Sequence, residues 1–189
     1  AKALAFLQSP REQVALITGI GCSSRIAAYT SLYGFHGVHG RALALAAGLK
    51  AARPDLTVLV AGGDGDGLSI GGNHFIHACR RNMDLTYIIM DNEVYGMTGG
   101  QTAPTTLTGQ KTSTSPYGRT RFTGEPLKVA EMMAGLDGPI YVERVALFDA
   151  KNRVKAAKAI KKALTLQVEG KGFSFVEVLA ECPTHLKMT

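Results

Sequence analysis

One stretch of the chain, residues 57–98, constrains the fold more than any other part of the sequence. Its apolar run at 58–61 leads into the glycine-rich segment 62–67, and a short apolar run that ends in glycines is typical of a buried parallel strand. The glycine-rich segment predicts a turn rather than a helix interior. A helix is predicted from there to Arg81, and a second apolar run at 85–90 predicts the next strand. The pattern therefore indicates one strand–helix–strand unit.

Polar residues follow both predicted strands. Asp64 and Asn92 lie 28 positions apart, and neighbouring parallel strands would bring them to the same edge of the sheet, where open α/β sheets bind ligands. Both offer hard oxygen donors, which suit Mg²⁺ or Ca²⁺. Glycines 63, 65 and 67 let backbone N–H groups approach an anion. A tight turn with a capping aspartate explains an isolated Gly-Asp-Gly, but the paired aspartate and asparagine favour a metal-bridged diphosphate.

The longer string that contains both residues carries a family resemblance. Residues 62–101 read GGDGDGLSIGGNHFIHACRRNMDLTYIIMDNEVYGMTGGQ. This string resembles the thiamine diphosphate-binding β subunit of 2-oxoacid:ferredoxin oxidoreductases, in the 2-oxoglutarate branch. The similarity runs from about Val14 to Thr120 and resumes at about 172–182. It implies an oxidative decarboxylation that yields an acyl-coenzyme A, with the electrons passed to ferredoxin.

The resemblance also implies residue roles. The side chains of Asp64 and Asn92 and the backbone carbonyl of Val94 are expected to hold Mg²⁺. The residues expected to contact thiamine diphosphate are Ile20, Gly21, Cys22, Ser23, His39, Gly63, Gly65, Asp66, Tyr95, Gly96, Met97 and Thr98. Arg25 and Met97 are expected in the substrate pocket. Many relatives carry lysine where this chain has Gly99, which leaves the choice of 2-oxoacid open.

Three cysteines, an odd and widely spaced set, suit a reducing compartment better than a disulfide framework. Cys79 lies among apolar residues at helical spacing and is predicted to be in the core. By resemblance, Cys22 and Cys182 are ligands of a 4Fe-4S cluster, which normally takes four thiolates. The other two family ligands form a CxxC pair upstream of the strand at Val14. Because the chain begins at Ala1, we expect that this segment is missing from it.

Composition bounds the class of protein. At 189 residues, with 46% apolar and 19% charged residues, the chain is expected to fold as a single domain, 1–189. It shows no membrane-spanning run and no signal peptide, which predicts a cytoplasmic protein. The net charge of +6 comes largely from residues 151–162. Without interleaved aromatic residues or a known motif this does not indicate nucleic-acid binding. A solvated helix face explains it, and so does attraction to an acidic protein such as ferredoxin.

The remaining pattern alternates strands and helices. Strands are predicted at 14–18, 140–145 and 173–179, helices at 42–52, 126–134 and 150–166, and the end of a helix at 1–6. Residues 34–41 and 93–121 are predicted as loops, the second long enough to be functional. His36, His74, His77 and His185 show no metal-ligand spacing and are interpreted as structural. This alternation predicts an α/β fold with a doubly wound, mainly parallel sheet and helices on both faces.

The sequence offers no glutamate suited to activate the cofactor. In the family that glutamate comes from a pyrimidine-binding domain on another subunit, so the resemblance implies an α subunit as partner, besides ferredoxin, coenzyme A and a 2-oxoacid. Two other classes stay open. A non-redox thiamine diphosphate-dependent decarboxylase or carboligase shares the aspartate–asparagine pair but needs no cysteine ligands. A phosphate-binding module without catalysis would not require Mg²⁺ with thiamine diphosphate.

Overall fold

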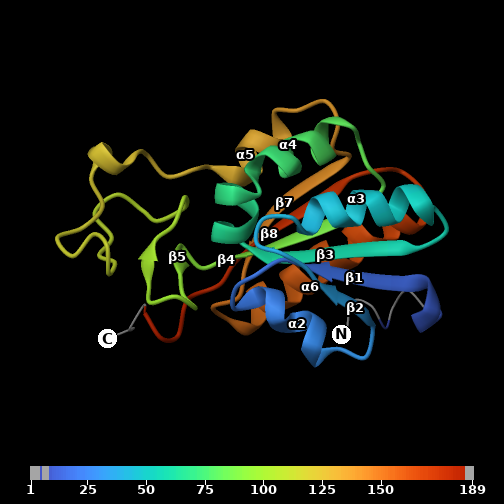
Figure 1. Cartoon of the computed structure of the whole chain (residues 1–189), viewed down its shortest axis with the longest axis horizontal. Helices are drawn as coiled ribbons and strands as arrows, with labels where there is room; N and C mark the ends of the chain where they lie inside the picture. Colours follow the sequence, from blue (N-terminus) through green and yellow to red (C-terminus); the bar gives the residue numbers. More distant parts are fainter. Residues whose placement is uncertain (1–4, 6–8, 186–189) are drawn as a thin grey trace.

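The computed structural model describes residues 5 and 9–185, and most of the helix end predicted at 1–6 lies outside the described residues. Its centre is a six-stranded sheet in the order β2-β1-β3-β4-β8-β7, in which every neighbouring pair is parallel (Figure 1). The strands are β1 (Val14–Thr18), β2 (Tyr33–His36), β3 (Thr57–Gly63), β4 (Thr86–Asp91), β7 (Tyr141–Ala146) and β8 (Ser174–Leu179).

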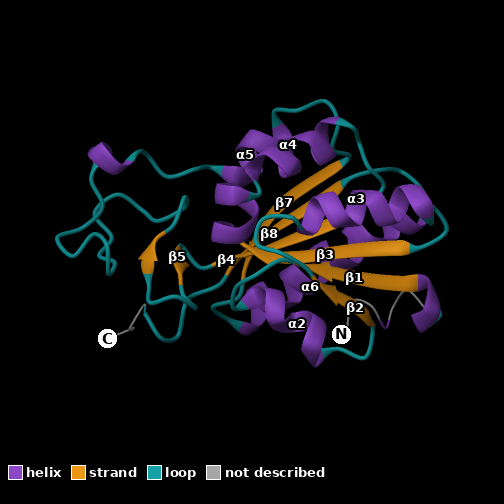
Figure 2. Ribbon diagram, in the orientation of Figure 1, coloured by secondary structure: helices purple, strands orange, loops and turns teal. Residues whose placement is uncertain are grey.

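Helices cover both faces of this sheet (Figure 2). One apolar core joins the sheet to α3 (Ala42–Ala52), α4 (Gly72–Arg80) and α5 (Val129–Ala134). A second core on the opposite face joins it to α6 (Ala150–Val168), with α2 (Ile26–Tyr29) packed at its margin. The two cores separate cleanly because successive residues of a strand point to opposite faces: Tyr87 and Ile89 belong to the first core and Ile88 to the second. The predicted doubly wound α/β fold is confirmed.

Three local predictions were wrong. The loop predicted at 34–41 is wrong at its start, because Tyr33–His36 form the edge strand β2; all four residues are exposed, so no buried face marks them as a strand. Helix α5 begins at Val129, three residues later than predicted. The predicted turn after β3 is helical: residues Gly65–Ile70 form a π-helix.

The glycines of that π-helix provide space rather than a turn. A Cβ atom on Gly67 would lie 2.0 Å from the hydroxyl of Tyr87, and one on Gly65 would lie 2.2 Å from the ring of Tyr95. Glycine is normally unfavourable in a helix, but here close packing against two tyrosines excludes any side chain. Because residues 65 and 67 carry no side chains, the π-helix can pack against these tyrosines immediately after the end of β3.

Between β4 and α5 the chain forms an extended segment, residues 92–128, which we call the arm (Figures 1 and 2). It contains a short antiparallel pair, β5 (Val94–Tyr95) and β6 (Gln101–Thr102), and one 3-10 turn, Arg121–Thr123. The predicted loop at 93–121 is thus mostly irregular. Arg119 is 5% exposed and its guanidinium donates to the carbonyls of Ala103, Pro104, Thr106 and Gly124. None of the helices in the described part of the chain combines the length and apolar character needed to cross a membrane.

Candidate thiamine diphosphate site

The site lies where the chain order of the sheet reverses. From β1 the chain crosses to the edge strand β2, whereas from β3 it crosses to β4 on the other side. The loop after β1 and the segment after β3 therefore diverge from two adjacent strand ends. A crevice at such a switch point is the usual ligand site of open α/β sheets.

A cavity occupies this crevice. Three segments line it: the loop after β1, the segment from the end of β3 into the π-helix, and the start of the arm; His39 closes one side. The lining residues are Ile20, Gly21, Cys22, Ser23, His39, Gly63, Asp64, Gly65, Asp66, Asn92, Val94, Tyr95, Gly96, Met97 and Thr98. The structure thus brings together all the residues expected to contact thiamine diphosphate or Mg²⁺.

Two buried carboxylates meet at the floor of the site. Asp64 and Asp91 are 2% and 3% exposed. The hydroxyl of Thr105, in the arm, lies 2.7 Å from Oδ2 of Asp64 and 2.8 Å from Oδ1 of Asp91. Because a hydroxyl donates one proton at a time, both contacts are hydrogen bonds only when one of the two acids is protonated. Burial, together with the charge of Asp91, raises the pKa of Asp64 to about 7.

The charge of this pair is not balanced by a cationic side chain. Among the described residues, no lysine, arginine or histidine forms an ion pair with Asp64 or Asp91. Buried carboxylates are normally paired with a cation or neutralised. Asn92 and Val94 line the same cavity as Asp64, so its residues include a carboxylate, a backbone carbonyl and a side-chain amide, whose oxygen accepts from the N–H of Val94 at 3.3 Å. This set of hard oxygen donors fits a magnesium ion that also binds phosphate oxygens.

Asp66 has a different role from Asp64. One oxygen of its buried carboxylate accepts hydrogen bonds from the backbone N–H groups of Ile20 (3.1 Å) and Gly40 (2.7 Å) and lies 2.7 Å from Nδ1 of His39. Because a carboxylate accepts, Nδ1 of His39 carries the proton and Nε2 is left as an acceptor or second donor. A Cβ on Gly19 would lie 2.1 Å from Asp66. Asp66 therefore joins two loops to the π-helix, a positioning role that the sequence analysis missed.

Two of the three cysteines meet beside the cavity. A Cβ atom placed on Gly96 would lie 3.3 Å from Sγ of Cys182 and 3.6 Å from Sγ of Cys22, although the two cysteines are 160 positions apart in the sequence. Cys182 is buried and Cys22 is exposed. Ligands of one cluster are expected to lie close together, and the structure confirms that proximity for Cys22 and Cys182. Cys79 lies in the first core with its sulfur 3.4 Å from that of Met133, so its assignment to the core is also confirmed.

The two residues expected in the substrate pocket differ in position. Met97 lines the cavity and is 45% exposed. Arg25 is exposed on the 3-10 turn Ser23–Arg25 and does not line the cavity. Thr105 was missed because its contact with Asp64 spans 41 positions and depends on how the arm folds back. Of the histidines interpreted as structural, His36 forms a hydrogen bond with the hydroxyl of Thr18, and His185 forms one with the carbonyl of Gly96.

The fold and the site together define a thiamine diphosphate-binding domain. Residues 13–178 match the family model described as "Thiamine pyrophosphate enzyme, C-terminal TPP binding domain", and the chain belongs to this family.

Within the family, the relatives are subunits of 2-oxoacid oxidoreductases. The chain is 47% identical to "2-oxoglutarate synthase subunit KorB" of Archaeoglobus fulgidus, over 94% of this chain and 62% of that protein. It is 44% identical to "Ketoisovalerate oxidoreductase subunit VorA" of Methanothermobacter thermautotrophicus, over 94% of this chain and 37% of that protein. A solved structure, "2-oxoglutarate:ferredoxin oxidoreductase from Magnetococcus marinus with 2-oxoglutarate, coenzyme A and succinyl-CoA bound", matches with a TM-score of 0.86 and 37% identity, over 99% of this chain and 60% of that chain. The chain thus spans less than two thirds of the length of each of these proteins.

The raised pKa of Asp64 predicts how stability depends on pH in the metal-free protein. Between about pH 4 and about pH 7 the folded protein keeps a proton on Asp64 that the unfolded chain has lost, so the free energy of unfolding falls as pH rises. Asp64→Asn removes this titration and should flatten the decline. Urea denaturation in the presence of a chelator measures it, with Asp137→Asn at an exposed position as the control. Parallel pH profiles for wild type and Asp64→Asn would contradict the assignment.

The Thr105 bridge gives a second prediction. Thr105→Val keeps the shape of the side chain but leaves both carboxylates without their shared partner, which should lower the free energy of unfolding by about 1–3 kcal/mol. Without the hydroxyl, Asp64 loses its orientation, and affinity for thiamine diphosphate with Mg²⁺ should fall roughly 10- to 100-fold. Calorimetric titration measures the affinity. Thr108→Val, at an exposed position of the same arm, should change neither quantity; equal behaviour of the two variants would exclude a positioning role for Thr105.

Proposed function

We propose that this chain is the thiamine diphosphate-binding β subunit of a 2-oxoacid:ferredoxin oxidoreductase. The enzyme would convert a 2-oxoacid and coenzyme A into an acyl-coenzyme A and CO₂ and pass two electrons, one at a time, to ferredoxin. The observation that carries the proposal is the pair Cys22 and Cys182, whose sulfurs converge at Gly96 on the wall of the cofactor cavity. A non-redox decarboxylase or carboligase has no use for two thiols there.

Mg²⁺ is assigned to the carboxylate of Asp64, the side chain of Asn92 and the carbonyl of Val94. The unbalanced charge of the buried acids supports this assignment, because a divalent cation neutralises both them and a diphosphate. Thr105 then has the task of orienting Asp64 toward the metal. The bound metal also removes the reason for Asp64 to keep a proton.

Thiamine diphosphate, when bound, supplies the electron sink that decarboxylation of a 2-oxoacid requires. The residues of this chain position it. The loop 20–23 and the segment 63–67 offer backbone N–H groups to the diphosphate, and His39, held by Asp66, presents Nε2 toward the same cavity. Tyr95 and Met97 form an apolar wall that limits access of water to the reacting end of the cofactor.

A 4Fe-4S cluster is assigned to Cys22 and Cys182, with its two other ligands outside this chain. The relatives' names support electron transfer to ferredoxin, and the free cysteines suit the reducing cytoplasm, where we locate the protein. Among the described residues that line the cavity there is no glutamate that could activate the cofactor. We infer that an α subunit with a pyrimidine-binding domain completes the site.

The substrate is assigned as 2-oxoglutarate. The relatives include subunits named for 2-oxoglutarate and for ketoisovalerate, and these substrates differ in a distal carboxylate that requires a cation. Arg25 lies on the turn that follows Cys22 and is the nearest arginine in sequence to the cavity loop. Gly99 supplies no cation and Arg25 does not line the cavity formed by this chain, so Arg25 could contact the distal carboxylate only in the site that the α subunit completes.

The proposal is tested by reconstitution. A full-length subunit that contains this chain together with the CxxC segment is coexpressed with a pyrimidine-domain α subunit and assayed with coenzyme A, thiamine diphosphate, Mg²⁺ and a viologen dye. We expect dye reduction with 2-oxoglutarate, less with branched 2-oxoacids, and none by the isolated chain, whose half-site leaves the reacting centre open to water. Decarboxylation without dye reduction would identify a non-redox enzyme. Dye reduction at catalytic rates by the isolated chain would contradict the two-subunit site.

The cysteine assignment has its own test. Cys182→Ser in the assembled protein should remove the iron-dependent absorbance and the paramagnetic signal of the reduced cluster, because serine is a poor substitute for a thiolate ligand. Binding of thiamine diphosphate with Mg²⁺ should persist. Cys79→Ala, which alters a core cysteine, should retain both the cluster and cofactor binding. Full iron content in Cys182→Ser would remove Cys182 from the ligand set.

A further inference from the structure

The net charge of the chain is concentrated on one helix. The whole sequence carries 21 lysines and arginines and 15 aspartates and glutamates, a net charge of +6. Helix α6 contains six basic residues and no acidic one, so the remainder of the chain is balanced. The basic residues are Lys151, Arg153, Lys155, Lys158, Lys161 and Lys162.

This distribution opposes helix stability. The N-terminal end of a helix favours negative charge and the C-terminal end positive charge, yet α6 has Lys151 and Arg153 at its start and no basic residue in its last turn. Lys151, Lys155, Lys158 and Lys162 follow one another at spacings of three or four residues, so like charges are neighbours on one face. Asp149 caps the helix, but folding alone does not favour the row of lysines, which points to a role outside folding.

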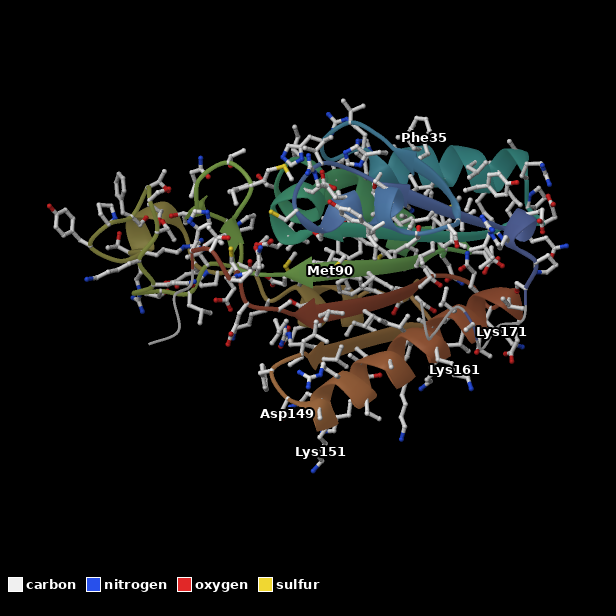
Figure 3. All side chains as sticks on the ribbon, turned by 90° about the horizontal axis from the view of Figure 1, so that it is seen from below. Phe35, Met90, Asp149, Lys151, Lys161 and Lys171 are labelled. Atoms are coloured by element: carbon white, nitrogen blue, oxygen red, sulfur yellow. The ribbon has the colours of Figure 1, made fainter. Side chains whose placement is uncertain are left out.

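The basic residues face solvent. Helix α6 packs onto the sheet through Ala156, Ala159, Ala163 and Leu164, whereas all six basic residues are exposed. Figure 3 shows Lys151 extending from α6 away from the sheet. Within the described part of the chain, no ion pair is formed by Lys151, Lys155 or Lys158. Their charges are available to a partner.

Apolar side chains accompany the charges at the start of the helix. Phe148 is 66% exposed and Val154 is 55% exposed. We call Phe148, Lys151, Val154, Lys155 and Lys158 the basic face. A small apolar centre with a charged rim is the usual composition of a transient protein–protein interface, in which the charges steer the encounter.

The basic face also begins at the carboxyl ends of the strands, the end of the sheet at which Cys182 follows β8. Ala146, the last residue of β7, pairs in register with Leu179, the last residue of β8. From there one chain segment reaches Phe148 within two residues, and the other reaches Cys182 within three. The chain segments that lead to α6 and to Cys182 therefore leave the sheet from the ends of two adjacent strands.

We propose that the basic face is the docking surface for an acidic electron-carrier protein that takes electrons from this site; this inference rests on the proposed function. Charge complementarity identifies the partner as acidic, and the shared end of the sheet identifies it as the electron acceptor. A membrane surface fits less well, because the apolar side of α6 is buried on the sheet and cannot enter lipid. Nucleic acid fits less well, because Phe148 is the sole aromatic residue of the face.

The test uses the assembled enzyme and an acidic ferredoxin. Neutralising the face with Lys151→Gln, Lys155→Gln and Lys158→Gln should raise the KM for ferredoxin roughly tenfold at low ionic strength and weaken its dependence on salt. Reduction of a viologen dye should be unchanged, because this small cation does not need the basic face to reach the site. Lysine-to-arginine changes at the same positions should keep the wild-type KM.

A matched control removes three exposed charges on the opposite face of the sheet, with Arg80→Gln, Arg81→Gln and Lys128→Gln, and should leave the KM unchanged. An unchanged KM for ferredoxin and an unchanged salt dependence in the α6 variant would overturn the docking proposal. Dye reduction by the same variant would still support the proposed oxidoreductase activity. Loss of dye reduction in the α6 variant would show that the face serves assembly instead. Failure of the wild type with both acceptors would instead refute the proposed function, and the docking inference with it.

Discussion

The contact between Asp64, Thr105 and Asp91 is the constraint on which the rest of the site depends. Two acids that are almost fully buried share one hydroxyl and have no cationic side chain as partner among the described residues. This arrangement is unfavourable by itself and becomes favourable when a proton or a metal ion is present. It also ties the arm to the ends of β3 and β4, so the orientation of Asp64 and the fold of the arm are determined together.

Asp66 organises a second part of the cavity, as Thr105 organises the part around Asp64. One oxygen of its carboxylate accepts hydrogen bonds from the loop after β1 and from the segment before α3, which includes His39. These contacts hold both segments against the first turn of the π-helix. The loop after β1, the segment with His39 and Gly40, and the π-helix belong to three successive crossovers of the parallel sheet. The cavity is thus built by hydrogen bonds between neighbouring crossovers, and the glycines at 19, 65 and 67 are required because the contacts leave no space for a side chain.

Periodicity and composition predicted the regular elements well, since β1 and α3 have the predicted bounds and Cys79 lies in the core. The failures share one cause, which is that tertiary contacts overrode a local signal. Glycines 65 and 67 predicted a turn, but two tyrosines from distant positions make them part of a helix. Residues 33–36 bury none of their side chains, yet they form a strand because β1 offers an open edge. The proximity of Cys22 and Cys182 came from the family resemblance, as no spacing rule connects residues so far apart.

The buried guanidinium of Arg119 has a consequence for how this domain moves. It fixes the arm through carbonyl groups rather than through an apolar core, so the arm is held by contacts that water can replace once the segment opens. Such a segment exchanges its amide hydrogens as a local unit, well below the energy of global unfolding. Because Thr105 lies within this unit and contacts Asp64, each opening event releases the floor of the site as well. Opening of the arm and binding of the metal proposed above at Asp64 are therefore linked equilibria.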